Sequence, residues 1–384
     1  MKIIKKIVKW LLILLTFVSI VIATLWLLNA PEQLSETSVS RTRLDQGDYV
    51  VEKVQLEVVD DSRPTDAVGG YEGDDKRVLK GAIWMPEGNS KGHPLVIYNH
   101  GFSGYHRDST YLVEYLARNG YVVAAVDFPL SSAKAPSDVP QLNDVVNQPG
   151  DVSKLIDHIL SMNSDSESVL YQRIDINNIG VMGLSLGGLT TGLVSFHPDY
   201  KDSRIKVAIM MAPPMVAFNE KFFANNRSVN SLLISGSLDR VVPQKDNALD
   251  VIPRNPRGWF LGMDKGTHLG FADIANYIRW VENPDNLGCA LFNLRLERLN
   301  LPEKWSDVLP NTGGVLRDVK TAKPCPELAG QSMNGLKQQW LTRLSIGAFF
   351  DMHLRAGEQS KQASDFFTTQ LLSENPSLSL KQPN

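Results

Sequence analysis

The chain has 384 residues, of which 43% are hydrophobic and 21% are charged, and its formal net charge is −3 at pH 7. This composition is typical of a globular protein with one large α/β domain plus appendages, or with two small domains. No basic patch and no cluster of cysteine and histidine residues stands out, so we expect neither a nucleic-acid partner nor a bound metal ion.

The N-terminal segment is predicted to anchor the protein in a membrane. An uncharged run from Trp10 to Leu28 follows four lysines, Lys2, Lys5, Lys6 and Lys9. As a helix this run would span roughly 28 Å, close to the hydrocarbon thickness of a bilayer. The lysines favour a cytoplasmic head, so we predict a signal anchor over residues 1–30, with the rest of the chain on the periplasmic or extracellular side. A cleaved secretory signal, which would give a secreted protein, is the alternative; Ala30 is a poor cleavage site because Pro31 follows it.

After a polar spacer over residues 31–48, the sequence predicts a single α/β domain over residues 49–384. Two alternating segments, Tyr49–Val59 and Val78–Trp84, predict an antiparallel hairpin at its start. The predicted strands that follow are Leu95–Tyr98, Tyr121–Val126, Ile179–Gly183, Val207–Met211, Leu232–Ile234 and Trp259–Met263. The predicted helices between them are Asp108–Asn119, Asp151–Met162 and Leu186–Phe196. Buried strands that alternate with helices indicate a mostly parallel central sheet with helices on both faces.

The chain is less regular beyond residue 282. Residues 283–329 are rich in Pro, Asn and Gly, and we interpret them as an irregular insertion with short helical pieces such as Leu291–Leu299. This insertion is long enough to form a flap over a site. A long amphipathic helix is predicted from about Met333 to Ala356, with Gly357 as its C-cap, and we expect it to be the last helix packed on the sheet.

A G-x-S-x-G motif, Gly183-Leu184-Ser185-Leu186-Gly187, lies between a predicted strand and a predicted helix. At such a tight turn the neighbouring side chains must be small, and the strained backbone holds the serine hydroxyl clear of the sheet. The N-terminus of the next helix also presents backbone N–H groups to developing negative charge. We therefore predict Ser185 to be a nucleophile rather than a structural serine.

A neutral serine needs a general base, and the base needs an orienting acid. Asp239 follows an apolar strand and a glycine turn, and His268 lies on a Gly-containing loop after the next strand. We predict that Ser185, Asp239 and His268 form a catalytic triad. Along the chain they occur in the order Ser, Asp, His, which is the order expected for this topology. Three other carboxylates precede Ser185 or lie poorly for the expected turn, namely Asp127, Asp246 and Asp264. Of these, Asp127 is interpreted as a carboxylate that organises a loop.

An oxyanion hole requires two backbone N–H donors for the tetrahedral intermediate. One donor is predicted to be Leu186, the residue after the nucleophile. The second is assigned to Phe102, because Gly101 permits the necessary turn after the strand that ends near Tyr98; a neighbouring residue on either side remains open. His100 precedes this glycine and is interpreted as structural.

These motifs resemble those of the α/β-hydrolase superfamily. Within it they are similar to the branch of dienelactone-hydrolase-like proteins, platelet-activating-factor acetylhydrolases and cutinase-like polyesterases. The segments that carry the resemblance are 99–102, 120–127, 183–188, 236–243 and 266–268. The resemblance implies an α/β-hydrolase fold and hydrolysis of small-molecule or lipid-like carboxylic esters through an acyl-enzyme, without metal or cofactor. Dienelactone hydrolases proper use a cysteine nucleophile, so Ser185 points away from their substrate.

Other functions remain open with the same residues. An acyltransferase or a peptidase would use the same triad, and a non-catalytic scaffold would retain the fold alone. Cys289 and Cys325, the only cysteines, both lie in the insertion. In an exported protein such a pair predicts a disulfide, and two separate buried thiols are the alternative.

Overall fold

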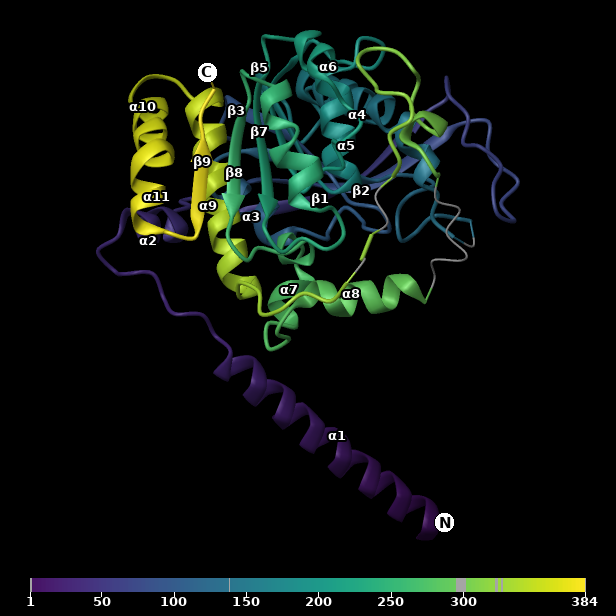
Figure 1. Cartoon of the computed structure of the whole chain (residues 1–384), viewed down its shortest axis with the longest axis vertical. Coiled ribbons are helices and arrows are strands. Elements are labelled where there is room, and N and C mark those ends of the chain that lie inside the picture. The colour runs from purple at the N-terminus through teal and green to yellow at the C-terminus, as the bar shows by residue number, and fades with distance from the viewer. Residues whose placement is uncertain (1, 138, 295–301, 322–323, 326, 384) are drawn as a thin grey trace.

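The computed structural model describes residues 2–137, 139–294, 302–321, 324–325 and 327–383 (Figure 1). A nine-stranded sheet forms the centre of the domain, in the order β1-β2-β4-β3-β5-β6-β7-β8-β9. The strands are β1 (Val51–Asp60), β2 (Arg77–Pro86), β3 (His93–Asn99), β4 (Val122–Asp127), β5 (Ile174–Leu184), β6 (Ile205–Met211), β7 (Asn230–Gly236), β8 (Trp259–Met263) and β9 (Leu378–Lys381).

The sheet is parallel from β4 through β3 and β5 to β8, and antiparallel at both edges. The predicted hairpin pairs β1 with β2 from Val51↔Pro86 to Asp60↔Arg77, and β2 then pairs with β4. These findings confirm the predicted α/β-hydrolase fold with its mostly parallel sheet. The sequence reasoning missed β9, which closes the far edge against β8.

Helices cover both faces of this sheet (Figure 1). The helices among the described residues are α1 (Lys2–Leu28), which extends away from the sheet, α2 (Val39–Asp45), α3 (Thr110–Arg118), α4 (Gln148–Ser164), α5 (Leu186–Phe196), α6 (Glu220–Ala224), α7 (Ile274–Tyr277), α8 (Pro284–Asn293), α9 (Gly335–Leu354), α10 (Gly357–Asp365) and α11 (Leu371–Glu374). One apolar core contains Leu155 of α4 and Leu193 of α5, and the other contains Leu116 of α3 and Phe349 of α9. The candidate catalytic residues Ser185, Asp239 and His268 follow β5, β7 and β8 along the chain. These strands are buried on both faces of the sheet.

Helix α9 differs from the predicted amphipathic last helix. It is buried around most of its circumference, including the polar side chains of Gln338 and Thr342, because α10 and the segments after it pack on its outer side. The helix ends at Leu354 with Arg355 as its C-cap, so the prediction of Gly357 as the C-cap was wrong; Gly357, with φ +62°, begins α10. The expectation of an amphipathic last helix was therefore wrong.

The insertion and the spacer also contain regular structure. Helix α8 begins at Pro284, where the Asn283 side chain accepts a hydrogen bond from the backbone N–H of Asp285. Of the predicted helical piece Leu291–Leu299, residues 291–293 form the end of α8, which starts earlier, and residues 295–299 lie outside the described residues. Within the predicted spacer, α2 packs on the C-terminal helices, where Glu374 accepts hydrogen bonds from its first backbone N–H groups.

Helix α1 contains an apolar stretch, Ile3–Leu28, that is long enough to cross a membrane. Its mean hydropathy is 2.8 over the most apolar window, and none of that window is buried in the protein. A signal sequence has the same character. The structure therefore contains the predicted apolar N-terminal helix. Its length and composition fit a retained membrane anchor and a cleaved signal sequence equally well.

A buried ion cluster connects the hairpin to α4. Arg77 of β2 is 0% exposed, and its guanidinium lies 2.7 Å from Asp151 and 3.2 Å from Asp144. Arg63 reaches the same Asp151 at 2.7 Å from the loop after β1. Because the charges compensate one another, these groups can be buried together; removal of one would leave the others uncompensated.

Candidate active site

Ser185 lies on the sharp turn between β5 and α5. Its backbone has φ 56° and ψ −119°, a conformation that residues with side chains rarely adopt. Its N–H donates to the Met211 carbonyl of β6 at 2.8 Å, which holds the turn against the neighbouring strand. A strained residue that its surroundings hold in place is characteristic of functional positions, and this geometry is that of a nucleophile elbow.

Two glycines allow the elbow to form. A Cβ atom on Gly183 would overlap the carbonyl group of Gly187, and a Cβ on Gly187 would overlap the carbonyl of Asn99 at the end of β3. Gly101 also packs on the elbow but less closely, since its Cβ would be 3.3 Å from the Leu184 carbonyl oxygen and from the Ser185 Cβ. Strand, elbow and the loop after β3 therefore meet backbone to backbone, as the motif predicts.

The structure brings His268 and Asp239 together. His268 Nδ1 lies 2.8 Å from Asp239 Oδ2, and both residues are buried. The other carboxylate oxygen of Asp239 accepts the backbone N–H groups of Val241 and Val242 at 2.9 and 2.7 Å. A neutral His268 that donates through Nδ1 presents Nε2 as the acceptor, which is the tautomer that a general base requires.

The loops that carry this pair pack directly on each other. The Leu238 N–H donates to the Gly266 carbonyl at 2.9 Å. A Cβ on Gly236 would overlap the backbone of Gly266, so glycine is needed where the loops cross. The position of Asp239 relative to His268 is thus fixed by the backbone as well as by the side chains.

Asp285 of α8 is a candidate that the sequence reasoning missed. Its carboxylate is 0% exposed and accepts backbone N–H groups of His268 at 2.9 Å, Leu269 at 2.8 Å and Arg240 at 3.0 Å. It therefore joins the loop of the base to the loop of the acid. Burial, and then the nearby Asp239 carboxylate, raise the pKa of Asp285, whereas His268 and the N–H donors act against this rise.

Gln338 of α9 holds the same histidine loop from the other side. Its side-chain oxygen accepts the Thr267 N–H at 3.0 Å, and its side-chain nitrogen donates to the Thr267 carbonyl at 2.8 Å. Because Gln338 is fully buried, this pair of bonds is shielded from water. The polar positions inside α9 thus support the loop that precedes His268.

An apolar pocket of about 120 Å³ opens at Ser185. Phe102 and Leu186 lie on its wall beside the serine, together with Val242 and with Phe292 of α8. Among the hydrogen bonds of the described loops and turns, neither the Phe102 N–H nor the Leu186 N–H has an acceptor. Both predicted oxyanion donors are therefore available to a substrate oxygen at this pocket.

His100 has a structural environment. It is 1% exposed, its Nε2 accepts the Phe128 N–H at 3.0 Å, and its Nδ1 lies 2.7 Å from the Gly101 carbonyl. Burial lowers the pKa of His100 to about 4, so the ring is neutral near pH 7. With both ring nitrogens engaged, it stabilises the loop that positions Phe102.

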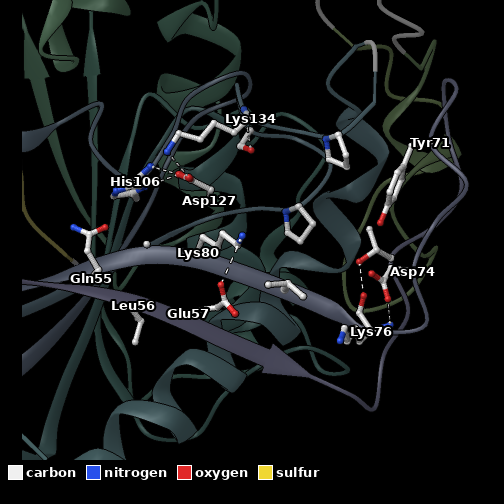
Figure 2. A pocket seen from close by; sticks show the side chains of 16 residues that line it. Gln55, Leu56, Glu57, Tyr71, Asp74, Lys76, Lys80, His106, Asp127 and Lys134 are labelled. Atoms are coloured by element: carbon white, nitrogen blue, oxygen red, sulfur yellow. Dashed lines mark hydrogen bonds and ion pairs between the residues drawn. The ribbon is translucent and has the colours of Figure 1, made fainter.

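A larger cavity, of about 750 Å³, is lined by none of the predicted triad residues (Figure 2). Figure 2 shows Asp127 pointing toward His106 and Lys134, at 2.8 and 2.9 Å. Burial would raise the pKa of Asp127, but hydrogen bonds from His106 and Lys134 lower it to about 2. These contacts agree with the interpretation of Asp127 as a carboxylate that organises a loop.

Cys289 of α8 and Cys325 are joined by a disulfide. The Cys325 N–H also donates to the Arg240 carbonyl at 2.7 Å, directly beside Asp239. The crosslink therefore ties the helix that carries Asp285 to a segment that contacts the acid loop.

Known proteins resemble this chain over its central part. Cutinase 1 of Thermobifida cellulosilytica is 28% identical over 216 residues, which are 53% of this chain and 74% of that protein. Cutinase est1 of Thermobifida alba is 28% identical over 192 residues, 49% of this chain and 57% of the relative, so the match spans little more than half of that relative's length. The ferulic acid esterase from Streptomyces cinnamoneus has the same fold, with a TM-score of 0.50, 18% identity and coverage of 86% of this chain and 96% of that chain.

The family match covers all three predicted triad residues. The profile of the PET hydrolase-like family matches residues 65–280, more than half of the chain, and includes Ser185, Asp239 and His268. Helix α8, with Asp285, lies outside the match. The cutinase relatives support the prediction of a carboxylic ester hydrolase. The chain therefore belongs to the PET hydrolase-like family, within the α/β-hydrolase esterases that its motifs resemble.

Proposed function

We propose that this protein hydrolyses carboxylic esters through an acyl-enzyme on Ser185. The observation that carries the proposal is the combination of a strained serine at an apolar pocket with a buried His268–Asp239 pair on the neighbouring loops. The cutinase and esterase names of the relatives support the same chemistry for this chain.

The geometry supports a sequence of four steps. His268 Nε2 takes the proton of Ser185 Oγ as the oxygen attacks the ester carbonyl, and the carbonyl oxygen becomes an alkoxide. The backbone N–H groups of Phe102 and Leu186 stabilise this alkoxide. Collapse breaks the C–O bond, and His268 gives its proton to the departing alcohol. Water then attacks the acyl-enzyme while His268 takes one of its protons; the second intermediate breaks its bond to Ser185 Oγ, and His268 returns the proton to that oxygen as the acid leaves.

The electrostatics of the pair favour this role for His268. Burial alone would lower the pKa of His268, but Asp239, and to a smaller extent Asp285, raise it above its ordinary value. Negative charge on this side of the ring stabilises the imidazolium that forms in each transition state. Ser185 therefore has a base strong enough to activate it.

The pocket indicates the size of the group it accepts. A volume of about 120 Å³ with mostly apolar walls is suited to a short acyl chain. The alcohol part of the ester would extend outside the pocket. We further propose that residues 1–30 anchor this domain on the exported side of a membrane and that residues 31–48 connect the two; cleavage of the same segment would instead release a secreted enzyme.

A covalent probe tests the proposal. Folded full-length protein in detergent is treated with a fluorophosphonate beside Ser185→Ala, and both are then tested on p-nitrophenyl esters of increasing acyl length. We expect labelling and hydrolysis for the unchanged protein alone, with the shortest esters cleaved fastest. Absence of labelling in the folded protein would overturn the proposal and favour a non-catalytic scaffold. Faster acyl transfer to added alcohols or amines than to water would identify an acyltransferase.

A further inference from the structure

Helix α1 contacts the domain at its C-terminal end. Among its described side chains, that of Trp26 is half-buried and the others are exposed. The Trp26 indole N–H donates to the Asn276 carbonyl at 3.0 Å, and the Arg279 guanidinium lies 3.6 Å from the centre of the ring. One residue beyond the helix, the Asn29 carbonyl accepts a hydrogen bond from Asn334 at 2.8 Å. Tryptophan prefers the membrane–water interface, so this contact marks the level of the exported lipid headgroups.

Four apolar side chains are exposed at the same end of the domain. They belong to α7 and α8, which both lie at the end from which α1 extends (Figure 1). Their exposed fractions are 46% for Ile274, 65% for Tyr277, 42% for Leu287 and 58% for Leu291. We call these four residues the α7–α8 face. Grouped apolar side chains next to an anchor are the pattern of a surface that lies on lipid.

The opposite side of α8 belongs to the active site. Asp285 holds the His268 loop, a Cβ on Gly288 would lie 2.6 Å from Leu269, and Phe292 lines the pocket at Ser185. A membrane that covers the outer side of α8 is therefore roughly one helix diameter, ~10 Å, from that pocket.

We propose that the α7–α8 face lies on the exported surface of the bilayer and that Ser185 receives esters dissolved in that bilayer. The proposal rests on the membrane anchor and the esterase activity proposed above, and it names their substrate class. The short acyl end of such an ester enters the pocket while its apolar remainder stays in the interface beside Leu287 and Leu291. A second protein chain would also cover apolar side chains, but α1 places lipid at this level.

Site-directed labels test the orientation. Full-length variants Tyr277→Cys and Leu291→Cys are given a nitroxide label and reconstituted in vesicles of phosphatidylethanolamine and phosphatidylglycerol. Collision rates are then measured with oxygen, which concentrates in lipid, and with a water-soluble nickel complex. Ile176→Cys is the matched control, because Ile176 is 55% exposed but lies at the start of β5, away from the carboxyl ends of the strands. Leu14→Cys reports whether α1 itself is in the bilayer.

We expect the labels at 277 and 291 to collide with oxygen more often than the label at 176, and the label at 14 to do so most of all. Labels at 277 and 291 that are as accessible to water as the label at 176, while the label at 14 is in lipid, would overturn the proposed face and leave the anchor intact. A label at 14 that is also in water would overturn the anchor and the proposed face together.

Activity measurements test the substrate route. The double variant Leu287→Ser/Leu291→Ser is compared with the unchanged protein on a water-soluble acetate ester and on an acetate ester of a long-chain alcohol dissolved in the vesicles. We expect hydrolysis of the vesicle-borne ester to fall by roughly fivefold or more while hydrolysis of the soluble ester is unchanged. Equal rates of the double variant and the unchanged protein on both esters would overturn the route, whereas loss of the soluble activity would indicate damage to the site. In that case Leu287→Lys alone, which keeps Leu291, repeats the comparison. No hydrolysis of either ester by the unchanged protein would contradict the esterase proposal itself.

Discussion

The Asp285 carboxylate accepts a hydrogen bond from the backbone N–H of His268 at 2.9 Å, although the two residues belong to different elements separated by α7. The same carboxylate reaches Arg240, the neighbour of Asp239. A buried charge in this position has two effects, since it fixes the backbone of the loops that carry His268 and Asp239 and adds negative potential at the histidine. Substitutions can separate these two effects from each other and from the stability of the fold.

Asp285→Asn is expected to lower both the free energy of unfolding and the pH at which activity appears. An amide accepts hydrogen bonds at one atom only, so the loss of a charged acceptor should cost about 1.5–3 kcal/mol in urea unfolding. Removal of the negative charge should also shift the rising limb of kcat/KM to lower pH, because Asp285 raises the pKa of His268. Asp264→Asn, an exposed carboxylate on the histidine loop, is the control and should change neither. If Asp285→Asn unfolds more easily but the rising limb of its kcat/KM profile lies at the same pH, then Asp285 stabilises the fold without affecting the pKa of His268.

The pH dependence of kcat/KM in the unchanged protein should follow the protonation of His268. Only the neutral ring accepts the serine proton, so kcat/KM should rise with pH as His268 loses its proton. Asp239 raises the pKa of His268 from its ordinary value of about 6.5, so the midpoint of this rise should lie above that value. Asp239→Asn should reduce kcat by about 10³–10⁴-fold and move the midpoint downward. A rising limb centred well below pH 6 in the unchanged protein would contradict the assignment of His268 as the base.

Gly183→Ala should damage the nucleophile elbow. The added Cβ would overlap the Gly187 carbonyl, and displacement of Ser185 by about 1 Å should slow fluorophosphonate labelling by roughly 10²-fold. Gly192→Ala on α5, the helix that follows the elbow, is the matched control: its nearest neighbours are the flexible ends of Met215 and Met210, at 3.3 and 3.4 Å. The control should label normally and gain a few tenths to about 1 kcal/mol of stability from better helix propensity. Equal labelling of both variants would argue against a strained elbow.

Removal of the disulfide should weaken the domain and the site together. Closure of the loop between Cys289 and Cys325 contributes about 4 kcal/mol in the chain-entropy account. The double variant Cys289→Ser/Cys325→Ser should therefore unfold at lower urea concentration and lose activity before global unfolding, because α8 carries Asp285. Reductant should have the same effect on the unchanged protein and none on the double variant. If the double variant stays active up to the urea concentration of global unfolding, the disulfide does not stabilise the active site separately from the rest of the domain.

Arg77→Met should be one of the most destabilising changes outside the site. It leaves Asp144 and Asp151 buried without their shared partner, a situation that costs about 3–5 kcal/mol. Lys80→Met, on the same strand, removes an exposed pair with Glu57 at 3.7 Å and should cost no more than about 1 kcal/mol. Similar urea midpoints for the two variants would contradict the importance of the buried cluster.

The sequence allowed prediction of the features that depend on local patterns. The apolar strands, the helix from Leu186 to Phe196 and the turn at Ser185 all follow from short-range periodicity and glycine placement, and the structure contains each of them. The assignments of Asp239 and His268 used the order of strands and loops, and the structure brings these two side chains together. Their catalytic roles stay predictions until the variants are tested.

Features that depend on distant contacts were not predictable in this way. Asp285 carries a helix-start signal, since Asn283 and Pro284 precede it, and this pattern could have located the beginning of α8. Nothing in the pattern says that its carboxylate reaches His268. The burial of polar positions on α9 likewise depends on α10, and the pairing of β9 with β8 joins segments more than a hundred residues apart.

The contact between Glu374 and the first turn of α2 has a consequence for biogenesis. Val39 and Ser40 receive their hydrogen-bond acceptor from a residue near the opposite end of the chain, at 2.9 and 2.7 Å, and β9 completes the sheet only after that residue. If the chain is exported from its N-terminus, as proposed above, it therefore cannot complete its fold until β9 has been synthesised and translocated. Until then the β8 edge and the outer side of α9 are exposed. Truncation that removes β9 should accordingly favour aggregation or proteolysis rather than a slightly weaker enzyme.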